Sequence, residues 1–346
     1  MFVAIVPGKR AAEAIREMLR RDLVERGMRI QRDGDGVMVP ITGGALPDDI
    51  VRRFGIRIEE RADRRRFVKE SPIVEIRNDL AEQGLDRTII DSLPDSWEML
   101  GDVLVIKLPE EVMPTKKIVA EAYASVLGAK SVLRDLGEIH GATRQPKMEL
   151  LVGTDTEATH LENGVLYSLD AANIMFSSGN VEERTRMGAI ECDGEVVLDM
   201  FAGIGYLSLP MAVHHEPKRI YACEISKLTY DYLERNIGLN GVGEVVMPIL
   251  GDNRAFTPPE KADRILMGYL NDTFMFLPKA LESLRSGGVI HYHENFPNAV
   301  LPGKPMAHLK EAAGEDWTFE IIRNRIVKTY SPGVSHVVID VRFTLS

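Results

Sequence analysis

One turn in the chain carries residue types that can bring a ligand against the backbone. Asp199 begins the segment DMFAGIGY, which contains Gly203 and Gly205. Both glycines can adopt positive φ and leave space beside the main chain. The segment follows an apolar run and precedes a helical pattern, which is the position of a ligand-binding turn at the end of a strand. A Gly-x-Gly turn is a weak signal alone, because the same turn can be purely structural.

Two acidic segments further along the chain make the turn more specific. Glu224 follows Gly203 by about 20 residues, where a carboxylate can accept hydrogen bonds from both ribose hydroxyls. Asp252 and Asn253 follow the next apolar segment, where a carboxylate can accept from an adenine amino group. Polar groups at three successive strand ends predict a site for one nucleoside.

A dinucleotide is the first alternative for this site. The pyrophosphate fingerprint requires a small residue at its third position, so that helix and strand pack closely. That position is Ser208. The departure favours S-adenosylmethionine over a nicotinamide dinucleotide as the cofactor.

A segment before the turn offers a second polar group. Ser177 lies in a loop rich in Ser, Gly and Asn that runs into Glu183, Arg184 and Arg186. An arginine fork there could hold the methionine carboxylate or a phosphate. From these residues alone, a helix start with solvated charges is the preferred interpretation.

The end of the fourth strand limits the chemistry. Many base methyltransferases carry Asn or Asp followed by Pro-Pro there, which accepts hydrogen bonds from the nitrogen being methylated. This chain has Met267, Gly268 and Tyr269, and only the phenol of Tyr269 is polar. The segment also lacks a cysteine nucleophile for covalent pyrimidine chemistry.

The elements that must position these residues follow a regular pattern from residue 161 to 346. Short apolar strands alternate with helical stretches, which predicts a parallel doubly wound α/β sheet. Residues 319–327 and 336–343 predict an antiparallel hairpin at one edge. This combination is typical of class I, Rossmann-like S-adenosylmethionine-dependent transferases. The five predicted parallel strands lie at 196–198, 219–222, 245–250, 264–267 and 289–292.

The chain before residue 161 divides into two small α+β parts. Residues 1–70 predict strand, helix and strand, at 2–6, 11–25 and 37–41, and a break falls near Ser71. Residues 71–160 predict strands at 103–108 and 147–152 and a helix at 115–127. We therefore expect three domains, 1–70, 71–160 and 161–346.

Composition restricts the class and the location of the protein. The chain has no apolar run of membrane-spanning length and no basic segment before the first apolar residues, so we expect a cytoplasmic protein without a signal peptide or membrane span. Cys192 and Cys223 match neither a disulfide framework nor a metal-ligand spacing, so no metal is expected.

The net charge of −10 counts against a nucleic-acid partner. Residues 1–70 differ, with 16 Lys and Arg against 12 Asp and Glu. Two interpretations of this basic part are equally good: a solvated helix face or a contact surface for tRNA. Its basic residues include Arg52, Arg53, Arg57, Arg61, Arg64, Arg65, Arg66 and Lys69.

Taken together, the motifs resemble those of the archaeal tRNA wybutosine-synthesising protein 2 family, a relative of the tRNA (guanine-N1) methyltransferases. The likeness covers essentially the whole chain, including residues 97–102, 141–144, 183–184 and 199–205. It implies transfer of the 3-amino-3-carboxypropyl group of S-adenosylmethionine to C7 of 4-demethylwyosine in tRNA(Phe), with methylthioadenosine released. The absence of Asn-x-Pro near Gly268 matches the aminocarboxypropyl branch.

The resemblance also implies roles for particular residues. Ser177 and Arg184 would hold the methionine end, Glu224 the ribose, and Asp252 with Asn253 the adenine. Asp199, Gly203, Gly205 and Tyr269 complete the expected cofactor site.

Two further residues match positions that lie at the target base in the methyltransferase relatives. These are Arg144 and Glu183. Glu183 could act as general base if its carboxylate reaches C7, and the alternative is a solvated helix charge.

Three other functions remain as alternatives at this stage. They are methylation of guanine N1 or of an imidazopurine, a tRNA-binding module without chemistry, and a nicotinamide dehydrogenase. The expected partner is tRNA(Phe), and a monomer is expected.

Overall fold

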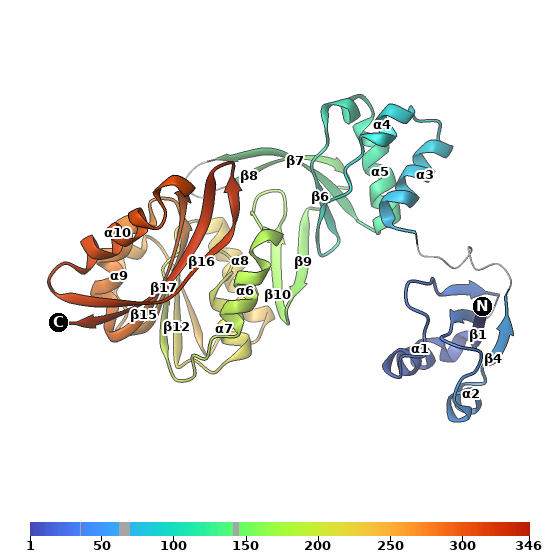
Figure 1. Cartoon of the computed structure of the whole chain (residues 1–346), viewed down its shortest axis with the longest axis horizontal. Coiled ribbons are helices and arrows are strands. Elements are labelled where there is room, and N and C mark those ends of the chain that lie inside the picture. The colour runs from blue at the N-terminus through green and yellow to red at the C-terminus, as the bar shows by residue number, and fades with distance from the viewer. Residues whose placement is uncertain (35, 62–69, 141–144) are drawn as a thin grey trace. The chain divides into compact units, whose positions relative to one another are not determined.

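The computed structural model describes the chain except for residues 35, 62–69 and 141–144. It divides into two compact units, Met1–Gln83 and Gly84–Ser346 (Figure 1). The three domains expected from the sequence remain a prediction. Among the described residues, no helix is long and apolar enough to cross a membrane.

The first unit contains a small antiparallel sheet with strand order β2-β3-β1-β4. Apolar residues of β1 and β3 pack with Met18 of α1 and Phe54 of α2 in one buried cluster. The predicted α+β character of this part is therefore present. The elements are β1 (Phe2–Pro7), α1 (Ala11–Arg20), β2 (Gln31–Asp33), β3 (Gly36–Pro40), α2 (Asp48–Phe54), β4 (Arg57–Glu60) and α3 (Pro72–Glu82).

Two expectations for this unit were wrong in detail. The helix predicted over residues 11–25 ends at Arg20, because Asp22 adopts a left-handed conformation with φ 55°. Val24 then bridges to Ile41 in extended backbone. The strands β2 and β4 were not predicted, because each is only three or four residues long.

The basic segment is also not one helix face. Arg52 and Arg53 lie in the last turn of α2, which Gly55 ends at φ 66°. Arg57 lies in β4. A turn therefore separates the arginines that the sequence suggested would share a helix. Arg61 follows β4 and pairs with Glu59 at 2.6 Å. The other members, Arg64, Arg65, Arg66 and Lys69, lie outside the described residues.

The second unit is organised around a seven-stranded sheet with order β13-β12-β11-β14-β15-β17-β16 in its described part. The pairs from β13 to β15 are parallel, and β17 pairs antiparallel with both β15 and β16. The predicted parallel sheet with a terminal hairpin is confirmed. Its strands are β11 (Val196–Asp199), β12 (Arg219–Glu224), β13 (Val246–Leu250), β14 (Ala262–Leu270), β15 (Leu284–Pro297), β16 (Trp317–Ser331) and β17 (Val334–Leu345).

Alternate residues of the central strands pack into two different cores. Val197 of β11 belongs to the core under α6, α7 and α8, whereas Val196 and Leu198 belong to the core under α9 and α10. Side chains of a strand alternate between the two faces of a sheet, so β11 is apolar throughout because both faces are covered. The covering helices are α6 (Val181–Gly188), α7 (Ser208–His214), α8 (Lys227–Leu239), α9 (Leu277–Ser283) and α10 (Gly303–Ala313) (Figure 1).

A smaller mixed sheet with order β5-β6-β7-β8 precedes this layer. β6 and β7 are parallel and are joined through α5, whose Tyr123 is fully buried. A separate hairpin of β9 and β10 leads into the loop before α6. The elements are α4 (Arg87–Asp91), β5 (Glu98–Leu100), β6 (Val103–Ile106), α5 (Lys116–Leu127), β7 (Ser131–His140), β8 (Gln145–Val152), β9 (Glu157–Glu162) and β10 (Val165–Asp170).

Candidate active site

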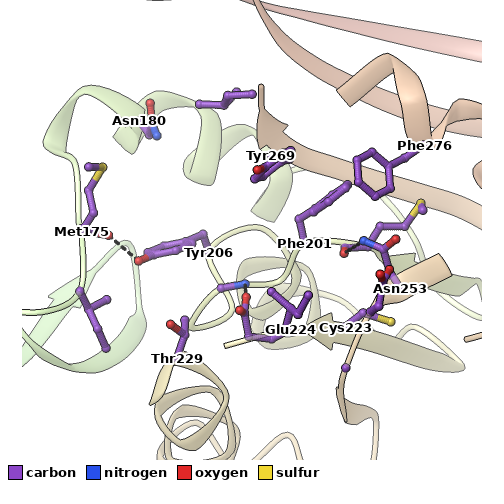
Figure 2. A pocket seen from close by; sticks show the side chains of 18 of the residues that line it. Met175, Asn180, Phe201, Tyr206, Cys223, Glu224, Thr229, Asn253, Tyr269 and Phe276 are labelled. Carbon is purple, nitrogen blue, oxygen red and sulfur yellow. Dashed lines mark hydrogen bonds between the residues drawn. The ribbon is translucent and has the colours of Figure 1, made fainter. Parts of the chain in front are cut away.

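A cavity of about 360 Å³ opens at the carboxyl ends of β11, β12, β13 and β14. The loop before α6 forms its opposite wall, and Figure 2 shows side chains from all these segments around it. This is the edge at which open α/β sheets bind ligands. Seven of the predicted site residues line it: Ser177, Arg184, Gly203, Glu224, Asp252, Asn253 and Tyr269.

The turn after β11 forms the floor of this cavity. Asp199 is fully buried and accepts a hydrogen bond from the backbone N–H of Phe201 at 3.1 Å. Gly203 has φ 58°, and a Cβ there would lie 2.4 Å from the Tyr206 ring. Gly205 has φ 100° and packs on Leu209. Asp199 and Gly205 therefore shape the turn from below and do not line the cavity.

Glu224 ties the ends of two neighbouring strands together. Its Oε2 accepts from the backbone N–H of Gly203 at 3.0 Å, and its Oε1 accepts from Ser226 at 2.7 Å. Burial raises the pKa of Glu224 above the usual value, although these backbone donors oppose the shift. The carboxylate is thereby held at the cavity edge beside Thr229 (Figure 2).

The segment after β13 presents one charged and one neutral side chain. Asp252 is paired with Arg254 at 2.6 Å, which lowers the pKa of its carboxyl. Asn253 donates from Nδ2 to the Met200 carbonyl at 2.6 Å. Its buried Oδ1 has no hydrogen-bond partner in the described part of the protein, which leaves an acceptor for a ligand.

Aromatic rings form the wall at the end of β14. Tyr269 stacks on Phe201 with ring centroids 5.2 Å apart, and Phe276 meets Phe201 edge-on at 4.9 Å (Figure 2). Such faces attract a cation that lies within about 6 Å. Leu270, the last residue of β14, has φ 76° and also lines the cavity.

The loop of residues 173–180 forms the wall opposite the sheet. Its Met175 carbonyl accepts from the Tyr206 hydroxyl, and the Ser177 Oγ accepts from Lys328 of β16 at 2.9 Å. Asn180 also lines the cavity, and its buried Oδ1 has no partner among the residues described. The loop is thus fixed from both sides and offers a free acceptor.

Arg184 reaches this wall from within the protein. Its guanidinium holds Glu162 through two hydrogen bonds of 2.5 and 2.7 Å, and Nη1 donates to the Ser177 carbonyl at 3.1 Å. Burial raises the pKa of Glu162, but the bonds from Arg184 outweigh it and lower the pKa to about 2. Arg184 therefore positions the Ser177 backbone in addition to lining the cavity.

Glu183 does not line this cavity, and its expected place at the target base stays a prediction. Its side chain is 2% exposed and is paired with Arg186 at 2.5 Å, and Nε2 of the His293 ring lies 3.6 Å away. Arg186 in turn contacts Asp340 at 2.6 Å. The reason is helical geometry: Arg184 and Glu183 are adjacent on α6 and so point in different directions.

Arg144, the second residue expected at the target base, lies outside the described residues. The sequence-based reasoning also missed several lining residues. Asn180 was read as part of a loop, and Thr229 sits one turn into α8. Asn180 lies three residues after Ser177, and Thr229 lies five residues after Glu224. Neither spacing forms a distinctive pattern, so no signal identified them.

Two properties of the cavity limit its chemistry. Burial raises the pKa of the Cys223 thiol to about 12, so this lining cysteine remains protonated at neutral pH. Within the described ranges, no three His, Cys, Asp or Glu side chains are grouped to hold a metal ion.

The parallel sheet, its terminal hairpin and a cavity with acceptors after three successive strands define a class I S-adenosylmethionine-dependent transferase. Residues 158–322 match the TRM5/TYW2 methyltransferase domain, and residues 76–156 match the TYW2 N-terminal domain. The chain is 45% identical over 265 residues to the tRNA(Phe) (4-demethylwyosine(37)-C(7)) aminocarboxypropyltransferase of Pyrococcus horikoshii, covering 76% of this chain and 95% of that protein. The chain belongs to the TYW2 family.

A solved structure and a second relative show how this chain compares with the two branches. The crystal structure of P. horikoshii TYW2 in complex with MeSAdo matches with a TM-score of 0.72 and 42% identity, covering 79% of this chain and 100% of that one. The tRNA (guanine(37)-N(1))-methyltransferase Trm5b of Pyrococcus abyssi is 32% identical over 94% of this chain and 96% of its own length. The methyltransferase branch is therefore related but less similar.

Proposed function

We propose that this protein transfers the 3-amino-3-carboxypropyl group of S-adenosylmethionine to C7 of 4-demethylwyosine in tRNA(Phe). The observation that carries the proposal is the 45% identity to the P. horikoshii aminocarboxypropyltransferase, which extends over 95% of that protein. The cavity supports it, because it presents separate acceptors for a nucleoside and for an amino-acid tail.

The nucleoside half of the cofactor fits the strand ends. Glu224 would accept from the ribose hydroxyls, since its two oxygens are already aimed by Gly203 and Ser226. The unpartnered Oδ1 of Asn253 would accept from the adenine amino group, and Asp252 would assist beside it. Asp199 and Gly205 would act indirectly, through the shape of the turn.

The amino-acid half fits the loop of residues 173–180. Asn180 Oδ1 would accept from the α-ammonium group, and Ser177 with Arg184 would hold the carboxylate. The stacked rings of Tyr269 and Phe201 would face the sulfonium charge. When bound, S-adenosylmethionine supplies the aminocarboxypropyl group and leaves as methylthioadenosine.

These proposed positions also bear on which of the three carbons bonded to the sulfonium is transferred. A sulfonium carries three carbons open to attack, and the bound geometry decides which one lies in line with the nucleophile. Polar anchors at Ser177 and Asn180 extend the tail along the loop, while the aromatic wall at Tyr269 offers no hydrogen-bond acceptor beyond one phenol. We propose that this arrangement turns the tail, instead of the methyl group, toward the acceptor.

Glu183 is better suited to positioning than to proton transfer. Its carboxylate, on α6, is buried against Arg186 of the same helix and against the ring of His293. We propose that it fixes α6, and through it Arg184, in place. A role for Arg144 at the base, selection of tRNA(Phe) over other tRNAs, a monomeric state and a cytoplasmic location stay predictions.

Methylation is the second candidate, and the 32% identity to Trm5b over 94% of the chain favours it. One assay separates the two. The protein is incubated with tRNA that carries 4-demethylwyosine and with S-adenosylmethionine labelled in either its methyl or its carboxyl carbon. We expect carboxyl label in the tRNA. Methyl label would establish methylation, and no label with intact cofactor binding would indicate a binding module.

Unmodified tRNA(Phe) with guanine at the target position is the matched control. Guanine lacks the acceptor carbon C7 of 4-demethylwyosine, so we expect neither label to enter this tRNA. Methyl label in this control alone would identify guanine methylation as the activity.

A further inference from the structure

Ser177 is contacted by two cationic side chains, one on its carbonyl and one on its hydroxyl. The guanidinium of Arg184 donates to the Ser177 carbonyl at 3.1 Å, and Nζ of Lys328 donates to the Ser177 Oγ at 2.9 Å. Arg184 belongs to α6, whereas Lys328 comes from β16 of the terminal hairpin. Lys328 does not itself line the cavity, so any effect that it has on a ligand there passes through Ser177.

The Lys328 side chain lies across the loop of residues 173–180. β16 contacts the 3₁₀ turn Ser178–Asn180 (η4) of this loop. A Cβ at Gly179 would lie 3.0 Å from Cδ and 3.1 Å from Nζ of Lys328, so the missing side chain lets the lysine pass close to the backbone. Arg325 of the same strand pairs with Glu182 at 3.0 Å. The strand is therefore held beside this segment at a second point that does not depend on Lys328.

The contact with Lys328 decides how the Ser177 hydroxyl can act. An ammonium group donates hydrogen bonds and cannot accept them, so the Ser177 Oγ is the acceptor in this pair. The single hydrogen of the hydroxyl is then directed away from Nζ and can be donated to another group. Since Ser177 lines the cavity, Lys328 prepares its hydroxyl as a donor to a ligand. A donor beside a positive charge is best suited to an anionic acceptor.

Arg184 supplies hydrogen-bond geometry to this wall more than it supplies charge. Its Nε and Nη2 donate to the carboxylate of Glu162, and the low pKa of Glu162 keeps that carboxylate ionised. The opposite charges of this close pair largely cancel at a distance. Lys328 adds a positive charge on the hydroxyl side of Ser177, where it attracts an anion bound to that hydroxyl.

We propose that Lys328 is a positioning residue that, through Ser177, makes the cofactor site select nucleosides whose tail carries a carboxylate. This inference rests on the proposed function, which places the amino-acid tail at the loop of residues 173–180.

The selection has a consequence for turnover. In the transfer, the C–S bond to the aminocarboxypropyl group breaks with its electron pair left on sulfur, a C–C bond forms at C7, and the C7 proton leaves to solvent. The carboxylate therefore leaves with the tRNA, and methylthioadenosine has none. Lys328 thus stabilises the bound donor and not the nucleoside product, which favours replacement of the product by a new donor molecule.

The test compares Lys328→Met with Lys328→Arg by calorimetry in the absence of tRNA. Methionine keeps an unbranched stem across Gly179 and removes the ammonium, whereas arginine keeps a positive charge. S-adenosylmethionine and S-adenosylhomocysteine carry the carboxylate, while decarboxylated S-adenosylmethionine and methylthioadenosine lack it. We expect Lys328→Met to weaken binding of the first two by about 5- to 30-fold, and of the last two by less than about 2-fold. Lys328→Arg should keep most of the affinity for the first two.

Two further variants show whether the effect is specific and whether it passes through Ser177. Lys310→Met, the same substitution at an exposed position of α10, is the matched control and should bind all four ligands as the wild type does. In a Ser177→Ala background, Lys328→Met should weaken binding of S-adenosylmethionine by less than about 3-fold, because the two changes remove one shared interaction. A full second loss in this background would contradict action through Ser177.

The outcomes separate this inference from the proposed function. Equal losses for all four ligands in Lys328→Met would show that the lysine only holds the loop, and would overturn the inference. Unchanged binding of all four ligands would also overturn it. Methyl transfer by the wild type, together with losses confined to the two carboxylate ligands, would overturn the proposed function and leave the selection by Lys328 standing.

Discussion

The carboxylate of Glu224 accepts a hydrogen bond from the backbone N–H of Gly203 at 3.0 Å, and this bond joins the ends of β11 and β12. The two residues are far apart in sequence but form one edge of the cavity. The turn and the acidic residue are therefore parts of one structure, in which each fixes the other. A change at Glu224 affects both the acceptor and the turn.

Replacement of Glu224 with alanine should weaken cofactor binding. The ribose hydroxyls would lose their acceptors inside a partly buried site, at a cost of about 1 to 3 kcal/mol. Calorimetry should show a similar loss for S-adenosylmethionine and for methylthioadenosine, because both contain the ribose. Glu234→Gln on the exposed face of α8 is the control. Unchanged binding by Glu224→Ala would remove this residue from the site.

Asn180 should distinguish the two ligands. Its Oδ1 is placed against the amino-acid tail, which methylthioadenosine lacks. Asn180→Ala should therefore lower the affinity for S-adenosylmethionine by about 5- to 150-fold, equivalent to 1 to 3 kcal/mol, and leave methylthioadenosine binding unchanged. Equal losses for both ligands in calorimetry would mean that Asn180 acts on the nucleoside half or on folding.

The buried Asp199 should make stability depend on pH. Burial raises its pKa from 3.8 to about 7, with the backbone donor of Phe201 opposing the shift. The folded state then binds the proton more tightly than the unfolded state, so the contribution to stability falls as pH rises from about 4 to about 7. It is constant above that window.

Asp199→Asn removes this titration and keeps an oxygen that can accept from Phe201. Compared with the wild type, we expect the variant to be relatively more stable at pH 8 than at pH 4, by up to about 4 kcal/mol for the full shift. Urea unfolding at several pH values measures the difference. Parallel pH profiles for the two proteins would show that Asp199 is ionised at neutral pH.

Glu183→Gln tests positioning against proton transfer. Because Glu183 is buried with Arg186, loss of its charge should lower the free energy of unfolding by up to about 3 to 5 kcal/mol. The affinity for S-adenosylmethionine should weaken through Arg184, while kcat at saturating cofactor should fall less than about 10-fold. The loss of a general base typically costs a factor of 10² to 10⁴. A fall of that size in kcat, with a lost acidic limb in the pH profile, would make Glu183 the base.

The parallel sheet and its terminal hairpin could be predicted because their sequence patterns are strong. The apolar strand segments alternate with helices, and the confirmed β16 and β17 are long and flank a Pro-Gly turn. The short strands β2 and β4 have only three or four residues. Periodicity needs more residues than this, so tertiary pairing determines these elements.

The candidate site also divides into residues that the sequence could predict and residues that it could not. Gly203, Glu224 and Asp252 could be identified because a single turn or strand end positions each of them. Glu183 could not, because its direction depends on Arg186 of the same helix and on Asp340 and His293 from distant segments. The sequence shows that two charges are neighbours along the chain, but only packing shows which one faces the cavity.

The co-product of the reaction tests the central claim most directly. During a turnover with tRNA that carries 4-demethylwyosine, chromatography of the small molecules identifies what remains of S-adenosylmethionine. Our account predicts methylthioadenosine in amounts equal to the modified tRNA. S-adenosylhomocysteine in those amounts would show that the methyl group had been transferred, and would contradict the account.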